Sequence, residues 1–238
     1  MHFRAEPERK DQIFEQADPE TQPKERQRYH ASIKYKLLIA TIIGFEILFI
    51  GFTKYQSIII GVNLFTENTF YTRVSAVQIS LIAATALINS LWTAEGGLLK
   101  NPSRTWLFTA AFATFLGFDE TFELHEAISK YSGEIFRLIG LQAKSSLWDI
   151  PLFIGYGIIA YWLWYGLKKD ISVVPPAQFL AYGGVALLAL SIFFDIALHK
   201  VVPVVWEDGF KLLGFLFIWL SFLTVTIFKL RLRKISSV

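Results

Sequence analysis

Six long apolar runs, separated by shorter polar segments, dominate the sequence after residue 35. They cover residues 37–52, 74–92, 105–127, 147–167, 179–198 and 210–228. At about 1.5 Å per residue, helices of roughly 16–23 residues cross most or all of a ~30 Å hydrocarbon core. The pattern therefore predicts an all-α fold, a polytopic membrane bundle of six transmembrane helices.

The two ends of the chain differ from this apolar body. Residues 1–34 carry charges of both signs and three prolines, and they lack the apolar stretch of a signal peptide. We expect a charged cytosolic tail there, disordered or partly helical. The predicted domains are this tail, a six-helix transmembrane domain over residues 35–230 and a basic cytosolic tail over residues 231–238.

Composition supports membrane insertion and excludes several kinds of chemistry. Hydrophobic residues other than glycine make up 53% of the chain, above the ~45–50% that soluble domains reach with glycine included. There is no cysteine, which excludes disulfides, thiolate metal sites, iron–sulfur clusters and a cysteine nucleophile. The net charge of +3 is small. We expect membrane lipids, and no nucleic acid, as partners.

The distribution of basic residues predicts how the six helices are oriented. With the N-terminus in the cytosol, 16 of the 23 Lys and Arg residues fall in inner segments and 7 in outer segments. Cytoplasmic loops of membrane proteins carry such an excess of Lys and Arg. We therefore expect both termini in the cytosol.

Ionisable groups from four of the predicted helices reach a similar depth. Each was measured from the nearest inner-side polar residue at ~1.5 Å per residue. Asp119 then lies at roughly 22 Å, Asp195 at 25 Å, Lys211 at 27 Å, Asp149 at 28 Å, and Glu126, His199 and Glu207 at 31–33 Å. Ionisable side chains at membrane depth are costly and usually functional. The sequence predicts a carboxylate cluster with histidine near the outer leaflet.

The first interpretation of this layer is a metal site. Asp195 and His199 are four residues apart and share a helical face, as a chelating pair does. Asp119 and Glu126 share a face of the third helix if that helix stays regular, and His125 can replace one of them if it unwinds. The predicted ligands are Asp119, Glu126, Asp195, His199 and His125. Carboxylate and imidazole ligands suit Zn, Fe, Mn or Cu.

A metal in this layer predicts an enzyme that acts on a lipid or another apolar substrate at the outer leaflet. Glu120, Glu207 or Asp208 is then the general acid or base, and Lys211 stabilises an anionic intermediate or the carboxylates. Hydrolysis by a metal-bound hydroxide and oxidation at iron or copper are both open. A buried ion-pair network explains the same groups without chemistry, because buried charges must be paired.

Two further functions remain open. Glu46 lies 10 residues from Lys36, roughly 15 Å into the membrane, where a carboxyl that changes its protonation can couple transport. Glu46 and Asn89, which lies nearer the inner side on the second helix, then form an inward continuation of the outer cluster, so a proton- or metal-coupled transporter is the first alternative. Gln78 falls near the outer side. A non-catalytic subunit of a larger membrane complex, or a homo-oligomer, is the second. Residues 129–146 are amphipathic and predict a surface-lying lid.

Two short motifs resemble a family of uncharacterised bacterial multipass membrane proteins without an assigned activity. The motifs are F-D-E-x-x-x-x-H-E near the end of the third run and W-E-D-G-x-K-x-x-G at the start of the sixth. The matching positions are Asp119, Glu120, His125, Glu126, Glu207, Asp208, Gly209 and Lys211. The resemblance implies a location in the bacterial inner (cytoplasmic) membrane and no reaction.

A second resemblance concerns architecture only. The six-helix C subunit of copper membrane monooxygenases has an acidic residue four before a histidine and paired acids opening the next helix. Asp195, His199, Glu207 and Asp208 are similar to that arrangement, but the second histidine pair is missing here.

Overall fold

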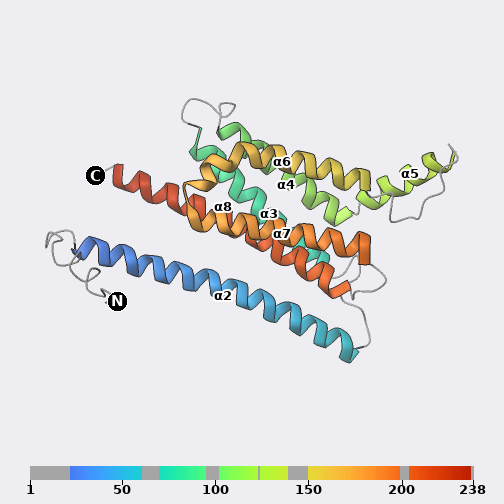
Figure 1. Cartoon of the computed structure of the whole chain (residues 1–238), viewed down its shortest axis with the longest axis horizontal. Helices are drawn as coiled ribbons and strands as arrows, with labels where there is room; N and C mark the ends of the chain where they lie inside the picture. Colours follow the sequence, from blue (N-terminus) through green and yellow to red (C-terminus); the bar gives the residue numbers. More distant parts are fainter. Residues whose placement is uncertain are drawn as a thin grey trace, which may run out of the picture. The chain divides into compact units, whose positions relative to one another are not determined.

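The computed structural model in Figure 1 describes residues 22–60, 70–94, 102–122, 124–138, 150–198 and 204–236, which are almost entirely helical. The all-α prediction is confirmed. The helices are α2 (Gln22–Ile60), α3 (Phe70–Trp92), α4 (Ser103–Phe122), α5 (Leu124–Leu138), α6 (Ile150–Ser172), α7 (Pro175–Leu198) and α8 (Val204–Ser236).

The chain divides into two compact units, Met1–Phe45 and Glu46–Val238. The described backbone of the first unit, residues 22–45, is helical throughout and belongs to α2. Helix α2 therefore begins inside the segment expected as a cytosolic tail. All residues of the candidate site lie in the second unit.

Four helices are long and apolar enough to cross a membrane, which indicates an integral membrane protein. The spans are Lys36–Gln56, Tyr71–Trp92, Pro175–Asp195 and Val205–Arg231. Helices α4 and α6 have 20 and 23 residues, a sufficient length, but within the described residues they are not among these four. Arg104, Asp119 and Glu120 lower the hydropathy of α4, and Lys168, Lys169 and Asp170 lower that of the last turns of α6.

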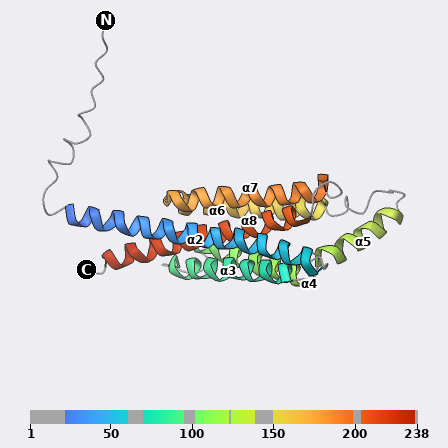
Figure 2. The ribbon, with the colours of Figure 1, turned by 90° about the horizontal axis from the view of Figure 1, so that it is seen from below.

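The end of the third apolar run differs from the prediction. A single helix was expected over residues 105–127, whereas α4 ends at Phe122 and α5 begins at Leu124. Both views show α5 leaving α4 at an angle (Figure 1, Figure 2). The reason lies in the sequence. The uninterrupted apolar part of this run ends before Asp119 and Glu120, and α5 is amphipathic, so the two helices require different surroundings.

The second unit is held together by long helix–helix contacts. Helix α7 lies along α8, α3 lies along α4, and α3 also packs against α8 (Figure 2). Helix α6 contacts α4, α7 and α8. The main core surrounds Trp106, which is fully buried and meets Phe222 edge-on at a centroid distance of 4.9 Å. Other members of this core are Ile79, Ile82, Ala86, Ala110, Ala113, Leu167, Ile171, Ala177, Ala181 and Val225.

Glycines let α7 and α8 approach until their backbones touch. A Cβ added at Gly184 would lie 2.9 Å from the carbonyl oxygen of Gly214, and one at Gly214 would lie 3.2 Å from that of Gly184. Gly166 of α6 faces Thr105 of α4 in the same way, with Cγ2 of Thr105 2.6 Å from an added Cβ. Small residues are the usual means of close packing between membrane helices.

Candidate functional site

One face of α3 carries a row of buried polar side chains. Tyr71, Ser75 and Gln78 are spaced i, i+4 and i+7, so they share this face, and each is buried. Asn89 is fully buried on the same face, about three turns beyond Gln78. The first three residues lie toward the Phe70 end of α3, where two carboxylates from neighbouring helices meet this row.

Glu120 of α4 is held between α3 and α8. Its Oε1 accepts a hydrogen bond from the Ser75 hydroxyl at 2.6 Å and pairs with the Lys211 ammonium at 2.7 Å. Asp208 and Glu207, one turn before Lys211 on α8, also act on Lys211 electrostatically. The cation is therefore paired with one carboxylate, which a hydroxyl also holds, and two more acids lie one turn before it on its own helix.

Glu46 of α2 meets the polar row of α3 at Gln78, one turn beyond Ser75. It is buried, and its Oε1 accepts a hydrogen bond from Nε2 of Gln78 at 3.0 Å. Oε1 of Gln78 is also buried and has no hydrogen-bond partner among the described residues. Lys211, Glu120, Ser75, Gln78 and Glu46 together are called the Lys211 cluster below.

Asp119 points to a different neighbour from Glu120. Its Oδ2 accepts a hydrogen bond at 3.0 Å from the hydroxyl of Tyr156 on α6, and the Tyr156 ring meets Phe112 and Phe115 edge-on. Successive residues of a helix are about 100° apart, so the two acids of the F-D-E motif serve two interfaces. Asp119 joins α4 to α6, whereas Glu120 joins α4 to α3 and α8.

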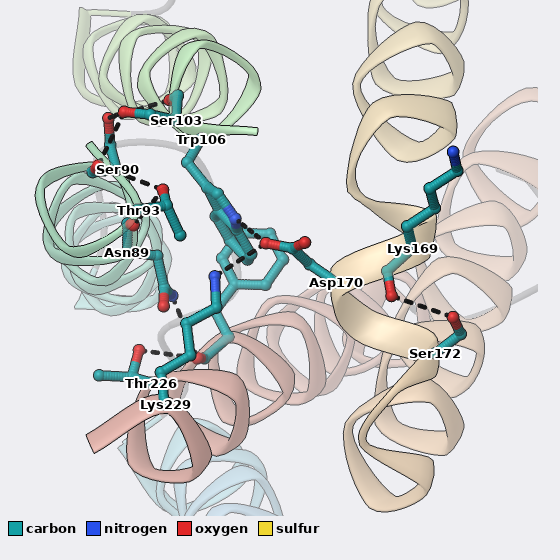
Figure 3. Close-up of polar contacts among 11 residues, drawn as sticks. Asn89, Ser90, Thr93, Ser103, Trp106, Lys169, Asp170, Ser172, Thr226 and Lys229 are labelled. Atoms are coloured by element: carbon teal, nitrogen blue, oxygen red, sulfur yellow. Dashed lines mark hydrogen bonds and ion pairs between the residues drawn. The ribbon is translucent and has the colours of Figure 1, made fainter. Parts of the chain in front are cut away.

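A second set of polar contacts joins α4, α6 and α8 at the other end of α8. Oδ2 of Asp170 accepts hydrogen bonds from the Trp106 indole and from the Lys229 ammonium, both at 2.8 Å (Figure 3). The Lys229 ammonium also lies 5.2 Å from the centre of the Trp106 ring, within cation–π range. Lys229, Asp170 and Trp106 are called the Lys229 cluster.

Small polar residues of α3 and α4 lie beside the Lys229 cluster (Figure 3). The Ser90 hydroxyl lies 3.1 Å from that of Ser103, and each hydroxyl also bonds the other residue's carbonyl oxygen. Nδ2 of Asn89 donates to the carbonyl oxygen of Phe222 at 3.4 Å. Oδ1 of Asn89 is buried without a hydrogen-bond partner among the described residues.

The two clusters mark opposite ends of one face of α8. Lys211 and Lys229 are 18 residues apart, which is five helical turns and roughly 27 Å. Between the clusters lies the apolar core around Ile79, Ile82 and Ala86 of α3. The second unit therefore has a polar region near each end of its helices and an apolar barrier between them.

The predicted metal ligands are only partly described. Asp119 and Asp195 lie on α4 and α7, and Asp195 is half-buried. His125 and Glu126 belong to α5, but their side chains are outside the described residues, as are His199, Asp149 and Glu123 entirely. Within the described part of the chain, no group of three or more His, Asp or Glu side chains is placed to hold a metal ion.

Residues 37–226 match the family described as Domain of unknown function (DUF8692). The chain belongs to this family. The resemblance to a family without an assigned activity is thereby confirmed. No curated protein and no solved structure matches the chain.

The family region contains the whole Lys211 cluster and ends at residue 226, before Lys229. Sequence reasoning missed Asp170, which was assigned to a connecting segment, and Tyr156, which carried no motif. A usable signal for Asp170 was its position directly after Lys168 and Lys169, at the depth of Lys229 on the last helix.

Metal analysis of this DUF8692 protein tests the predicted ligand set directly. If the metal site exists, elemental mass spectrometry detects stoichiometric Zn, Fe, Mn or Cu in the purified protein. Replacing Asp195 and His199 together by Ala then removes the metal, because two of the predicted ligands are lost. Lys169→Ala, an exposed change outside the set, leaves the metal content unchanged. Wild-type protein without metal, or an unaffected double variant, refutes the prediction.

Proposed function

We propose that the chain is a proton-coupled transporter with six spans, both termini in the cytosol, in the inner membrane of a bacterium. Four apolar helices support membrane insertion. Helices α4 and α6 supply the other two spans, since they have the necessary length and pack against α3, α7 and α8. The excess of Lys and Arg in the segments assigned to the cytosol supports the orientation.

The observation that carries the proposal is the pairing of Glu46 with Gln78. Nε2 of Gln78 donates to one oxygen of Glu46, while Oε1 of Gln78 has no partner among the described residues. A protonated Glu46 supplies the missing donor, because a carboxylic acid and a carboxamide can exchange two hydrogen bonds. A buried carboxyl without a nearby cation is far cheaper in its neutral form, and no cation is found acting on Glu46 among the described residues.

The position of Glu46 also suits transport. It lies 10 residues from Lys36, and Gln78 lies 8 residues from Phe70, so the pair is roughly 15 Å and 12 Å from the two sides. Binding sites of secondary transporters lie near the bilayer midplane. Toward the Phe70 end, Ser75, Glu120 and Lys211 continue the polar path.

Toward the other end the path is closed. Ile79, Ile82 and Ala86 of α3 belong to the apolar core. Thr85, the one buried polar residue of α3 between Gln78 and Asn89, donates its hydroxyl to the carbonyl oxygen of Leu81 at 2.7 Å, so it offers no free donor to a path. A site that is polar on one side and sealed on the other corresponds to one of the two states of alternating access. The proton on Glu46 is the coupled ion, and the Glu120–Lys211 pair stands between it and the nearer surface.

A transport assay in inverted membrane vesicles tests the proposal. Respiration acidifies the vesicle interior, and a pH-sensitive dye reports the gradient. Na⁺, K⁺, Mg²⁺ and Mn²⁺ are added one at a time, because a site with two acids favours cations. Wild-type vesicles lose the gradient on addition of a transported cation, and vesicles with Glu46→Gln keep it, since glutamine cannot release a proton. Glu46→Asp retains part of the activity.

Chemical labelling supplies an independent readout. A hydrophobic carbodiimide adds to a protonated carboxyl in the membrane, and peptide mass spectrometry locates the adduct. We expect the adduct on Glu46 and its absence in Glu46→Gln. The proposal fails if Glu46 stays unmodified in wild type, or if Glu46→Gln dissipates the gradient as fast as wild type.

A further inference from the structure

Helix α5 has one apolar and one charged face. Leu124, Ile128, Tyr131, Ile135 and Leu138 fall within about 80° of one another on the helix. Glu126, Lys130 and Arg137 occupy positions on the opposite side of the helix, and Glu134 lies at the edge of the apolar face. Such separation of apolar and charged residues is typical of a helix with an apolar surface along one side only.

The apolar face of α5 is exposed in the second unit. Tyr131 is 68% exposed and Leu138 86% exposed, and Leu124 and Ile128 are also exposed. Helix α5 contacts α4, the helix that precedes it, and leaves it at an angle (Figure 1). Exposing this face to water would cost about 25 cal/mol per Å² of apolar area, so an apolar surface outside the bundle is needed to cover it.

The start of α5 lies at the level of a membrane surface. Glu120, four residues before Leu124, bonds Ser75, which is four residues from Tyr71, the first residue of the Tyr71–Trp92 span. Four residues of helix correspond to roughly 6 Å. Leu124 therefore begins α5 about where that span ends, and the lipid interface is the apolar surface next to it.

We infer that α5 is an interfacial helix, inserted by its apolar face into the lipid surface at the Phe70 end of α3. Interfacial helices bury this face by about 5–10 Å at the boundary of headgroups and acyl chains. The charges of α5 are balanced, with Lys130 and Arg137 against Glu126 and Glu134. Insertion therefore depends on apolar burial and not on anionic lipids.

The lack of cysteine makes the test direct, because the native chain gives no labelling background. Ile128→Cys and Lys130→Cys place a thiol two residues apart but about 200° around the helix. Each full-length variant is labelled with an environment-sensitive fluorophore and reconstituted into vesicles of phosphatidylcholine, with and without phosphatidylglycerol. Spin-labelled lipids then quench from the bilayer, and iodide quenches from the water.

The label at position 128 is expected to be quenched several-fold more by spin-labelled lipid than the label at 130, and several-fold less by iodide, in both vesicle types. Equal access of both labels to iodide overturns the inference, because α5 then stands off the membrane. Shielding of position 128 from both quenchers also overturns it, since a protein surface or a second copy then covers the face. Dependence on phosphatidylglycerol contradicts the apolar mode of insertion.

Discussion

Replacing Lys211 by Met lowers the stability of the folded protein by about 3 kcal/mol, the lower end of the ~3–5 kcal/mol measured when one partner of a buried ion pair is removed. Methionine keeps the length and the apolar stem of the side chain but leaves the Glu120 carboxylate, 12% exposed, with the Ser75 hydroxyl alone. The loss lies at the lower end because the Lys211 side chain is 31% exposed. Thermal unfolding in detergent, followed by circular dichroism, measures the loss.

A double-mutant cycle separates the pair from the rest of the site. Glu120→Gln in the Lys211→Met background removes the unpaired carboxylate while the amide can still bond Ser75. We expect this double variant to regain most of the lost stability, because two neutral groups replace two charges. Lys211→Arg keeps the positive charge and serves as the conservative control. An unchanged unfolding temperature in Lys211→Met means that the ion pair does not stabilise the fold.

Replacing Gly184 by Ala destabilises the α7–α8 contact by about 1–3 kcal/mol, the usual cost of overpacking. The added Cβ would lie 2.9 Å from the carbonyl oxygen of Gly214 and 2.9 Å from Ile218. A side chain can rotate away, but a backbone carbonyl moves only with its helix, so α7 and α8 must separate. Weaker helix packing then appears as a lower unfolding temperature and earlier loss of the folded state in a denaturing detergent titration.

Gly157→Ala on α6 is the matched control, because a Cβ there would meet nothing within 4 Å. The same substitution in open space should be neutral or stabilising by up to about 1 kcal/mol, since alanine has the higher helix propensity. Both variants replace glycine by alanine, and only the space around the added methyl group differs. Equal effects at Gly184 and Gly157 would show that close packing of α7 on α8 is not what limits stability.

The sequence predicted the all-α fold, the membrane character and the resemblance to a family without assigned activity, because apolar periodicity and short motifs are local properties. Six spans and their orientation stay predictions, since four helices pass a strict length and hydropathy requirement. The sequence left the regularity of the third helix open and did not predict its end at Phe122, because a run of acids, aromatics and a histidine fits a regular helix as well as a new amphipathic one.

The contact partners of the ionisable side chains were harder to predict than the depth of those side chains in the membrane. Asp119 was placed in the ionisable layer by counting residues, and Glu120 follows it directly, but counting does not say which neighbour lies on which side of α4. In the structure, Asp119 accepts a hydrogen bond from Tyr156, whereas Glu120 contacts Lys211 and Ser75. The roles assigned to the predicted acids and to Lys211 stay predictions, and His199 lies outside the described residues.

The five-turn spacing of Lys211 and Lys229 has a consequence for the surrounding lipid. Each lysine pairs with an acid of another helix. Its ammonium group is therefore held in place and cannot extend toward a more distant water boundary. The ~27 Å between them equals the core of a thin bilayer, about 27 Å, and falls short of the ~32–33 Å of thick, sterol-rich ones. The two ion pairs of α8 thus set a preferred bilayer thickness, and a thicker bilayer must thin around the protein.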